Sequence, residues 1–251
     1  MIVITGYGFV GKAIEAALQP HVHVNIVDPA VNNNRVYNFD ADAVIIAVAT
    51  PEALDSSCNM QNVFDVLEDV PKDVPVLIKS TISIEGWREL NHKYPDHKIT
   101  FSPEFLRANT AIQDFQDQHC IFLGGGNHQY WEDLFLTTIN KPSKVVEPEA
   151  LILAKQFRNS FLATKVTFFN QVNDLCEVLD IDYDQVKGVI TADQRIGHSH
   201  TEVTDERGFG GHCFPKDTEA LVYSALHNGC SLSLVQEAIR YNKKIRKSVD
   251  K

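Results

Sequence analysis

The first eleven residues restrict the possible folds of this chain more than any other feature. Residues 2–5 read as a strand, and the next six place three glycines in a GxGxxG pattern before a helix predicted at 12–18. In such a turn, the first glycine allows a tight bend, the second lets a pyrophosphate approach the backbone, and the third allows close packing of helix on strand. The pattern predicts a dinucleotide site formed by Gly6, Gly8, Phe9, Val10 and Gly11.

An acidic residue follows the second predicted strand, which covers residues 22–27. Asp28 stands where a carboxylate can accept hydrogen bonds from the hydroxyls of an adenosine ribose, and this arrangement favours NAD over NADP. Arg35 lies a few residues beyond and could instead pair with the additional phosphate of NADP, which stays open as the lesser alternative. We therefore expect NAD as the cofactor.

Short apolar runs recur through residues 1 to about 145, at 43–48, 74–78, 99–102 and 120–123. Their nearly continuous hydrophobicity is typical of strands buried on both faces, hence of a parallel sheet covered by helices. Polar residues follow three of these runs, at 50–51, 80–81 and 102–104. Each could be a turn or a helix cap when taken alone. Because ligands bind beyond the carboxyl ends of parallel strands, we expect these residues to line one site.

The pattern changes at residue 149. A long helix is predicted at 151–177 and a second at 183–190, followed by a polar loop at 191–207 and further helices. We therefore expect an α/β domain at 1–147, with a doubly wound, mostly parallel sheet, and an all-α domain at 148–251. Lys155 and Asn159 share one face of the long helix, where they could reach a substrate oxygen, but their spacing alone favours a solvated polar face. Phe157, Phe161 and Leu162 are expected in the core.

Composition excludes several classes of partner. The chain has 251 residues and a formal net charge of −10, which argues against binding to nucleic acid or to an anionic membrane. Its apolar runs are too short to span a membrane, and the N-terminus reads as the first strand rather than as a signal peptide. The five cysteines have no CxxC spacing, which predicts reduced thiols, a cytoplasmic location and no metal site.

One cysteine has the setting of a nucleophile. Cys213 follows the glycine-rich run 208–211 and His212, and it precedes Pro215, a residue suited to the first turn of a helix. The positive end of a helix and the nearby Lys216 favour a thiolate at this position. The structural alternative is a buried cysteine after a tight turn, because free cysteines usually behave as small core residues.

Seven motifs in order along the chain resemble those of the nucleotide-sugar dehydrogenases, specifically the UDP-glucose 6-dehydrogenase group. They are GYGFVG at 6–11, ATP at 49–51, KST at 79–81, SPEFLR at 102–107, the 155–165 helix, DQRIG at 193–197 and GFGGHCFPKD at 208–217. Lys216 and Asp217 resemble the UDP-glucose members, whereas His212 resembles the N-acetylhexosamine members. The resemblance implies a Rossmann-like NAD-binding domain followed by a central helical domain.

The resemblance also implies the reaction, an NAD-dependent four-electron oxidation of a sugar CH₂OH to a carboxylate. Cys213 would capture the intermediate aldehyde as a thiohemiacetal, a second oxidation would give a thioester, and water would release the uronate. Oxyanions would be stabilised by Lys155 and Asn159, and water would be activated by Glu104. Thr81 and Asp217 match residues that hold a catalytic water and orient the lysine.

Further contacts follow from the same resemblance. Cofactor contacts are implied for Thr50, Pro51, Thr81, Glu104 and Lys216, in addition to the glycine turn and Asp28. Contacts with the nucleotide sugar are implied for Phe105, Leu106, Arg107, Lys155, Asn159, Arg195, Phe209 and Gly210. A homodimer through the long helix is also implied.

The chain departs from the family pattern in three places. Ala108-Asn109 replace Glu-Gly, and Asp205-Glu206 replace Pro-Gly before the glycine run. Full-length relatives continue into a third domain that binds much of the UDP, so we expect a short form, for which a separate partner could supply that domain. Two alternatives stay open: a two-electron dehydrogenase of the 3-hydroxyacid type, and a truncated cofactor-binding paralogue without independent activity.

Overall fold

The structure is a computed structural model that describes residues 1–53, 57–211 and 213–247. The chain forms two compact units, Met1–Lys155 and Gln156–Lys251. The boundary expected at 147/148 coincides with the start of the long helix α6, Pro148–Leu179, which continues through the division between the units. His212, which belongs to the cysteine motif, lies outside the described residues.

The first unit is built on a seven-stranded sheet with the order β2-β1-β3-β4-β5-β6-β7. The strands are β1 Ile2–Thr5, β2 Val24–Val27, β3 Ala43–Ile46, β4 Val76–Ile78, β5 Ile99–Phe101, β6 Ile121–Gly125 and β7 Ser143–Val145. Both β2 and β3 pair with β1 in parallel, one on each side, so the chain reverses its direction of winding at β1. The doubly wound, mostly parallel sheet predicted from the sequence is thereby confirmed.

Two features of the sheet differ from the expectation. β6 pairs with β5 in the antiparallel direction, and β7 was not predicted. The direction of β6 cannot be read from its sequence because a buried apolar run looks the same in either direction. β7 is a short strand at the edge of the sheet, and its Lys144 and Val145 are exposed. Its sequence therefore lacks the apolar run that marks a buried strand, because charged residues are common at sheet edges.

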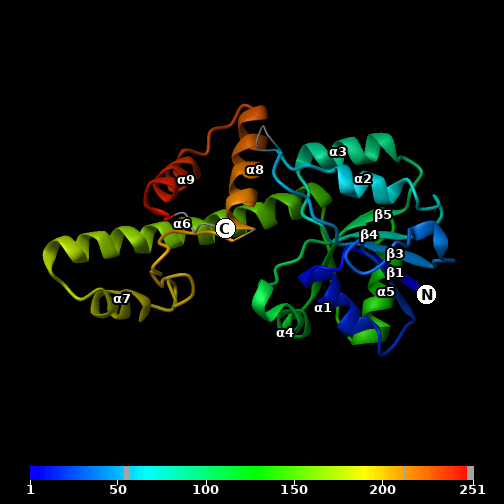
Figure 1. Cartoon of the computed structure of the whole chain (residues 1–251), viewed down its shortest axis with the longest axis horizontal. Coiled ribbons are helices and arrows are strands. Elements are labelled where there is room, and N and C mark those ends of the chain that lie inside the picture. Colours follow the sequence, from blue (N-terminus) through cyan, green and yellow to red (C-terminus); the bar gives the residue numbers. More distant parts are fainter. Residues whose placement is uncertain (54–56, 212, 248–251) are drawn as a thin grey trace. The chain divides into compact units, whose positions relative to one another are not determined.

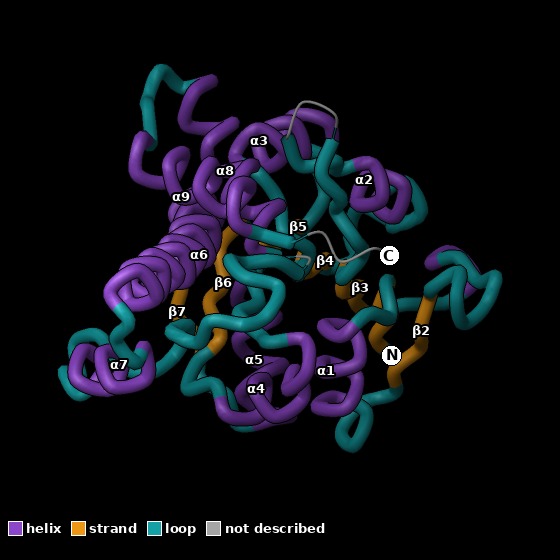
Figure 2. The backbone as a smooth tube through the Cα atoms, turned by 60° about the vertical axis from the view of Figure 1, so that its left-hand side comes forward, coloured by secondary structure: helices purple, strands orange, loops and turns teal. Residues whose placement is uncertain are grey.

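Helices cover both faces of this sheet, as Figure 2 shows for α1, α4 and α5 on one side and α2 and α3 on the other. Their bounds are α1 Phe9–Leu18, α2 Gln61–Leu67, α3 Ile84–Lys93, α4 Ala111–Asp117 and α5 His128–Ile139, with short 3-10 helices at Val36–Asn38 and Ala108–Thr110. Side chains alternate along each strand, so Val3 packs towards α2 and α3, whereas Ile2 and Ile4 pack towards α1, α4 and α5. The core therefore forms two layers, one on each face.

The second unit is helical. It contains most of α6, then α7 Tyr183–Thr191, α8 Phe214–His227 and α9 Ser233–Ile245 (Figure 1). A small core of Ala163, Phe209 and Ile239 joins α6, the glycine run and α9. In the described part of the chain, none of the helices combines the length with the hydropathy needed to cross a bilayer.

The phenylalanines of α6 were expected in the core, and this expectation was wrong. Phe157 is 45% exposed and Phe161 is 68% exposed, while Leu162 is half-buried. The buried positions of α6 instead mix polar side chains with apolar ones: Gln156, Asn159, Ser160, Thr167 and Asn170 are buried, as are Leu151, Ile152, Ala163, Phe169 and Cys176. Hydrophobicity alone therefore does not mark the buried face of this helix.

Candidate active site

The glycine turn between β1 and α1 has the geometry that a dinucleotide requires. Gly6 has a φ of +88°, and a Cβ there would lie 2.5 Å from the carbonyl oxygen of Ala47. A Cβ on Gly11 would lie 2.1 Å from the carbonyl oxygen of Gly6, so close packing of α1 on β1 excludes a side chain. At Gly8 no described atom lies within 4 Å of such a Cβ, and the backbone is open to a ligand. The residues present therefore fit a dinucleotide.

Asp28 is held at the end of β2 by two backbone amides. Its Oδ2 accepts a hydrogen bond from the amide of Tyr7 at 2.6 Å, and its Oδ1 accepts one from Ala30 at 2.8 Å. Because Tyr7 lies inside the glycine turn, these bonds fix the carboxylate beside the phosphate-binding backbone. This arrangement places an acceptor where the ribose of NAD needs one.

Arg35, the residue that kept NADP as an alternative cofactor, forms an ion pair with Asp69. Its Nε and Nη2 donate to the two carboxylate oxygens of Asp69 at 2.5 and 2.9 Å, and its guanidinium lies 5.8 Å from the ring centroid of Tyr37. A bidentate pair of this kind is among the stronger charge-assisted contacts. The cation that could bind the additional phosphate of NADP is therefore already paired.

This pairing leads to a test of cofactor selectivity. Asp69→Asn is expected to release the Arg35 guanidinium and to lower the Kd for NADPH by roughly tenfold, the equivalent of about 1.4 kcal/mol, with the Kd for NADH unchanged. Fluorescence titration of the reduced cofactors measures both values. Glu68→Gln is a matched control, since Glu68 pairs with Lys93 and not with Arg35. Unchanged NADPH affinity in Asp69→Asn would contradict this role.

The carboxyl ends of β3 and β4 are tied together by side chains predicted at the site. Thr50 Oγ1 donates to the carbonyl oxygen of Thr81 at 2.7 Å, and Ser80 Oγ donates to that of Val48 at 2.8 Å. Cys58, which is buried, places its Sγ 3.4 Å from the same carbonyl of Thr81. The first unit thus brings Thr50 and Thr81 into contact beyond the carboxyl ends of β3 and β4.

Glu104 follows β5 and is buried with a lysine that sequence reasoning did not assign to the site. Lys79 forms an ion pair with Glu104 Oε1 and donates a hydrogen bond to Ser102 Oγ at 2.8 Å. Lys155 donates to the backbone carbonyl of Glu104, and its Nζ lies 5.6 Å from the ring centroid of Phe105. Glu104 is therefore held by one lysine at its side chain and by another at its backbone.

The neighbouring substrate candidates differ in their surroundings. Leu106 packs against the core layer beside α1, α4 and α5. Arg107 is largely exposed and pairs with Asp114 at 2.6 Å. The hydrogen bond from Arg107 lowers the pKa of Asp114 despite an opposing effect of burial. The structure therefore does not place the Arg107 side chain with the buried cluster around Glu104.

In the second unit, the catalytic candidates lie at the start of α8. Cys213 directly precedes the helix and is half-buried, and its carbonyl accepts the amide of Asp217 at 2.9 Å. Asp217 is 1% exposed and accepts hydrogen bonds from Asn159 Nδ2 at 2.5 Å and from Lys216 Nζ at 2.9 Å. Asn159 is therefore buried and bonded, so the expectation of a solvated polar face was wrong for this residue.

The glycine run before Cys213 is clamped by α6 and α9. Asn242 accepts a hydrogen bond from the amide of Phe209 at 2.7 Å and donates one to its carbonyl at 3.0 Å. The amide of Gly208 donates to Asn170 Oδ1 at 3.1 Å. Arg246 pairs with Glu206 at 2.6 Å, so one of the two acids that replace the family's Pro-Gly is neutralised.

A second clamp holds Arg207, the residue before the glycine run. Asp174 of α6 accepts hydrogen bonds from both Arg207 and Tyr241. Burial opposes ionisation of Asp174, but these two bonds outweigh it and lower the pKa of the carboxyl group. Burial and the same carboxylate raise the pKa of Tyr241 to about 12. The arrangement fixes the backbone that leads to Phe209, Gly210 and Cys213.

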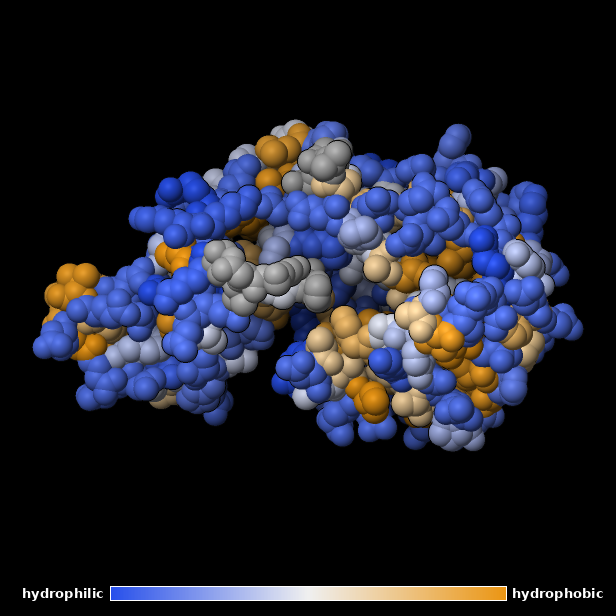
Figure 3. Space-filling model, viewed as in Figure 1, coloured by the Kyte–Doolittle hydropathy of each residue, from blue (hydrophilic) through white to orange (hydrophobic). Residues whose placement is uncertain are grey.

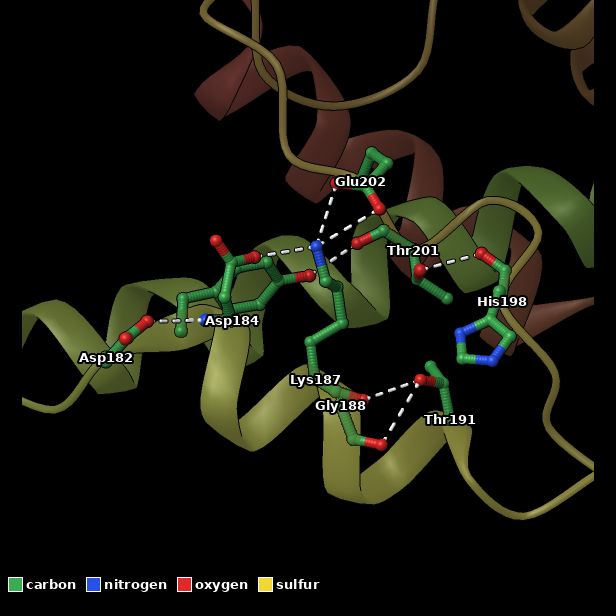
Figure 4. A network of polar contacts seen from close by, with 9 residues as sticks. Asp182, Asp184, Lys187, Gly188, Thr191, His198, Thr201 and Glu202 are labelled. Carbon is green, nitrogen blue, oxygen red and sulfur yellow. Dashed lines mark hydrogen bonds and ion pairs between the residues drawn. The ribbon is translucent and has the colours of Figure 1, made fainter.

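The loop that contains Arg195 is held by α6 and α7. Lys165 of α6 donates to the carbonyls of Ile196 at 2.7 Å and Gly197 at 3.2 Å. Lys187 of α7 contacts Asp184 at 2.7 Å and Glu202 at 2.9 Å, and Tyr183 donates to the carbonyl of Thr201 (Figure 4). Arg195 itself pairs only locally with Asp193 at 2.5 Å, and its side chain is 89% exposed. The structure therefore does not bring Arg195 into the buried cluster around Asn159 and Asp217. Within the described ranges, no group of three His, Cys, Asp or Glu side chains converges as a metal site requires.

The glycine turn, the ribose acid and the doubly wound sheet define a dinucleotide-binding unit of the NAD-dependent dehydrogenase class. Residues 15–139 match the NAD binding domain of the UDP-glucose/GDP-mannose dehydrogenase family, and residues 150–244 match the central domain of the same family. The chain belongs to the UDP-glucose/GDP-mannose dehydrogenase family, which confirms the resemblance seen in its motifs.

Individual relatives agree with this assignment. The chain is 31% identical over 226 residues to a UDP-glucose 6-dehydrogenase of Rickettsia felis, covering 85% of this chain and 50% of the relative. It is 28% identical over 250 residues to UDP-glucose 6-dehydrogenase YwqF of Bacillus subtilis, covering 93% and 56%. The chain thus spans about half the length of the curated relatives it matches.

Solved structures share the fold. A UDP-glucose dehydrogenase from Pyrobaculum islandicum superposes with a TM-score of 0.81 at 26% identity, over 97% of this chain and 68% of that one. A 3-hydroxyisobutyrate dehydrogenase from Mycobacterium tuberculosis superposes with a TM-score of 0.75 over 97% and 92%. At 20% identity, the second likeness shows the fold alone.

Proposed function

We propose that this chain supplies the NAD-binding and catalytic residues of a nucleotide-sugar 6-dehydrogenase that converts UDP-glucose to UDP-glucuronate. One observation carries the proposal. α8 begins directly after the half-buried Cys213, and its first turn holds a buried carboxylate, Asp217, bonded to Asn159. A two-electron dehydrogenase needs neither a nucleophilic cysteine nor this support around it.

The proposed chemistry divides between oxidation and release. NAD held by the glycine turn and Asp28 would supply the hydride acceptor for both oxidations at C6. Cys213 adds as a thiolate to the aldehyde carbon, forming a C–S bond and a thiohemiacetal that is then oxidised to a thioester. Lys155 and Asn159 stabilise the oxyanions that develop on the C6 oxygen. Their positions one turn apart on α6 suit a shared oxyanion role.

Release requires water. Glu104 accepts a proton from the water that attacks the thioester carbon, the C–S bond breaks, and Cys213 leaves as a thiolate. Thr81 holds the water and Asp217 orients the lysine. The hydrogen bond from Asn159 Nδ2 to Asp217 also fixes the amide of Asn159. The glycine turn with Phe9, Val10 and Asp28, together with Thr50, Pro51 and Lys216, binds the cofactor. Phe105, Leu106, Arg107, Arg195, Phe209 and Gly210 contact the nucleotide sugar.

Counting NADH tests this function. Incubation with UDP-glucose and NAD is expected to form two NADH for each sugar nucleotide consumed, with the acid as product, measured by absorbance and by chromatography. One NADH per sugar would support a two-electron alcohol dehydrogenase and contradict the proposal. Binding of NAD in calorimetry without any turnover of UDP-glucose would support a cofactor-binding paralogue instead.

We also propose a homodimer through α6. Exposed apolar side chains follow one face of the helix, with Phe161, Phe168 and Leu175 at seven-residue spacing and exposures of 68, 55 and 59%. Such spacing is typical of a helix that packs against another helix. Hydrophobic residues also gather at the end of α6 beside its connection to α7 (Figure 3), where Val178 is 82% exposed. Apolar surface of this extent usually has a partner.

Phe161→Asp is expected to convert the dimer to a monomer, because a carboxylate would be buried in an apolar seam at high cost. Analytical ultracentrifugation at several protein concentrations measures the change. Leu234→Asp is the control, since Leu234 is similarly exposed at 72% but lies on α9. A Phe161→Asp protein with unchanged sedimentation would exclude this face as the interface.

A further inference from the structure

Among the described residues of the first unit, the most buried ion pair contains the catalytic candidate Glu104. The side chain of Lys79 is 1% exposed and that of Glu104 is 5% exposed. Lys79 lies at the carboxyl end of β4, directly after Ile78, and Glu104 follows β5, which pairs with β4. The two charges are therefore brought together by neighbouring parallel strands at the edge of the sheet where ligands bind.

A purely structural explanation of this pair is weak. Two charges removed from water lose solvation energy that their mutual attraction often does not recover, and apolar residues of similar size are frequently as stable. The ammonium group of Lys79 is nevertheless fixed by a second contact, because it also donates a hydrogen bond to Ser102 Oγ at 2.8 Å. A buried pair with such fixed neighbours is common at sites where a charge must be held in place for chemistry.

The two oxygens of Glu104 are not equivalent. Oε1 is in the ion pair with Lys79, whereas Oε2 is buried and makes no hydrogen bond with any residue that the structure describes. The backbone of the same residue is fixed separately, since its carbonyl accepts a hydrogen bond from Lys155. Glu104 thus has a restrained main chain, one carboxylate oxygen in an ion pair and one buried oxygen without a hydrogen-bond partner among the described residues.

We propose that Lys79 is the positioning residue of Glu104, holding Oε1 so that the charged carboxylate presents Oε2 to the water that releases the acid product. This inference rests on the function proposed above. In the release step, water adds its oxygen to the thioester carbon, one water proton passes to Oε2, and the C–S bond to Cys213 breaks with its electron pair on sulfur. Lys79 exchanges no proton and touches no substrate; it acts through Glu104.

Loss of Lys79 is expected to slow release of the acid without slowing the two oxidations, and this difference can be measured. In Lys79→Met, both oxidations proceed and the thioester persists. A rapid-mixing experiment with UDP-glucose and NAD is expected to show a burst of two NADH per active site, followed by steady-state turnover reduced roughly 10²-fold. Intact-protein mass spectrometry is expected to detect the acyl adduct, and peptide mapping is expected to place it on Cys213. Glu104→Gln is expected to behave in the same way.

Two further variants control for folding. Lys72→Met removes an exposed lysine that pairs with Asp96 at 2.8 Å, and it is expected to match the wild-type protein in burst and turnover. Lys79→Met leaves a carboxylate buried without its partner and could unfold the chain. The double variant Lys79→Met/Glu104→Gln removes that charge, and it is expected to fold, to form the two-NADH burst and to retain the adduct.

The outcomes are distinguishable. A folded Lys79→Met protein in which burst and steady-state rates fall by the same factor, without an adduct, would assign Lys79 a structural role and overturn the proposal. An adduct in Glu104→Gln with wild-type partitioning in Lys79→Met would overturn the role of Lys79 and leave the proposed function standing. A wild-type chain that binds NAD but forms no NADH would reject the proposed function and the role of Lys79 with it.

Discussion

Replacement of Cys213 by serine is expected to abolish release of the uronate while leaving the affinity for NAD unchanged. A serine hydroxyl is far less nucleophilic at neutral pH than a thiolate, so capture of the aldehyde fails and steady-state turnover falls by roughly 10³-fold or more. The measurement is acid formation by chromatography beside calorimetric titration with NAD. We expect the cofactor Kd to stay the same, because the glycine turn and Asp28 lie in the first unit.

The control for Cys213→Ser is Cys230→Ser. Cys230 is exposed and follows α8, and its replacement is expected to leave turnover unchanged. If Cys213→Ser still produced two NADH and one acid per sugar nucleotide, the covalent route would be wrong. The chain would then have to oxidise the aldehyde as its hydrate.

Replacement of Asp217 by alanine is expected to affect both stability and turnover. Asp217 is 1% exposed and is the acceptor for Asn159 Nδ2 and Lys216 Nζ. Its loss leaves a buried amide without an acceptor and is expected to lower the free energy of unfolding by about 1–3 kcal/mol. Because Asn159 is then free to rotate away from the oxyanion, turnover is expected to fall by roughly 10²-fold.

Urea unfolding and steady-state kinetics measure the two effects of Asp217→Ala separately. Glu237→Ala serves as the control, since it removes an exposed carboxylate that pairs with Arg240 at 2.5 Å on α9. That change is expected to alter unfolding by less than about 0.5 kcal/mol. Wild-type turnover in a destabilised Asp217→Ala protein would restrict Asp217 to a structural role.

Local patterns were sufficient for several elements. The glycine turn predicted the β1–α1 unit because only glycine permits the positive φ of residue 6 and the close approach at residue 11. Asp28 was predicted to bind the ribose from its place after β2, and that role stays a prediction. Pro215 correctly indicated the first turn of α8. In each case the physical requirement concerns residues that are close in the chain, so a short stretch of sequence contains all the information needed.

Contacts between residues far apart in the sequence could not be predicted from local patterns. The partner of Arg35 is Asp69, and that of Phe209 is Asn242, separated in each case by more than thirty residues. Phe157 and Phe161 were assigned to the core because large apolar residues are usually buried, but α6 instead buries several polar side chains, of which Asn159 and Asn170 are hydrogen-bonded. Whether a residue is satisfied depends on its neighbours in space, which spacing along one helix does not specify.

Residue order thus determined the cofactor-binding fold and the helical second region, since these depend on backbone geometry and hydrophobic period over short distances, and it supplied the site residues as predictions. Tertiary structure alone decided the partners of the buried carboxylates. It buried Glu104 against Lys79 through two adjacent strands, and Asp217 against Asn159 through two helices. The reason is physical: the charge and orientation of a buried group are set by atoms within a few ångströms, and those atoms come from distant parts of the chain.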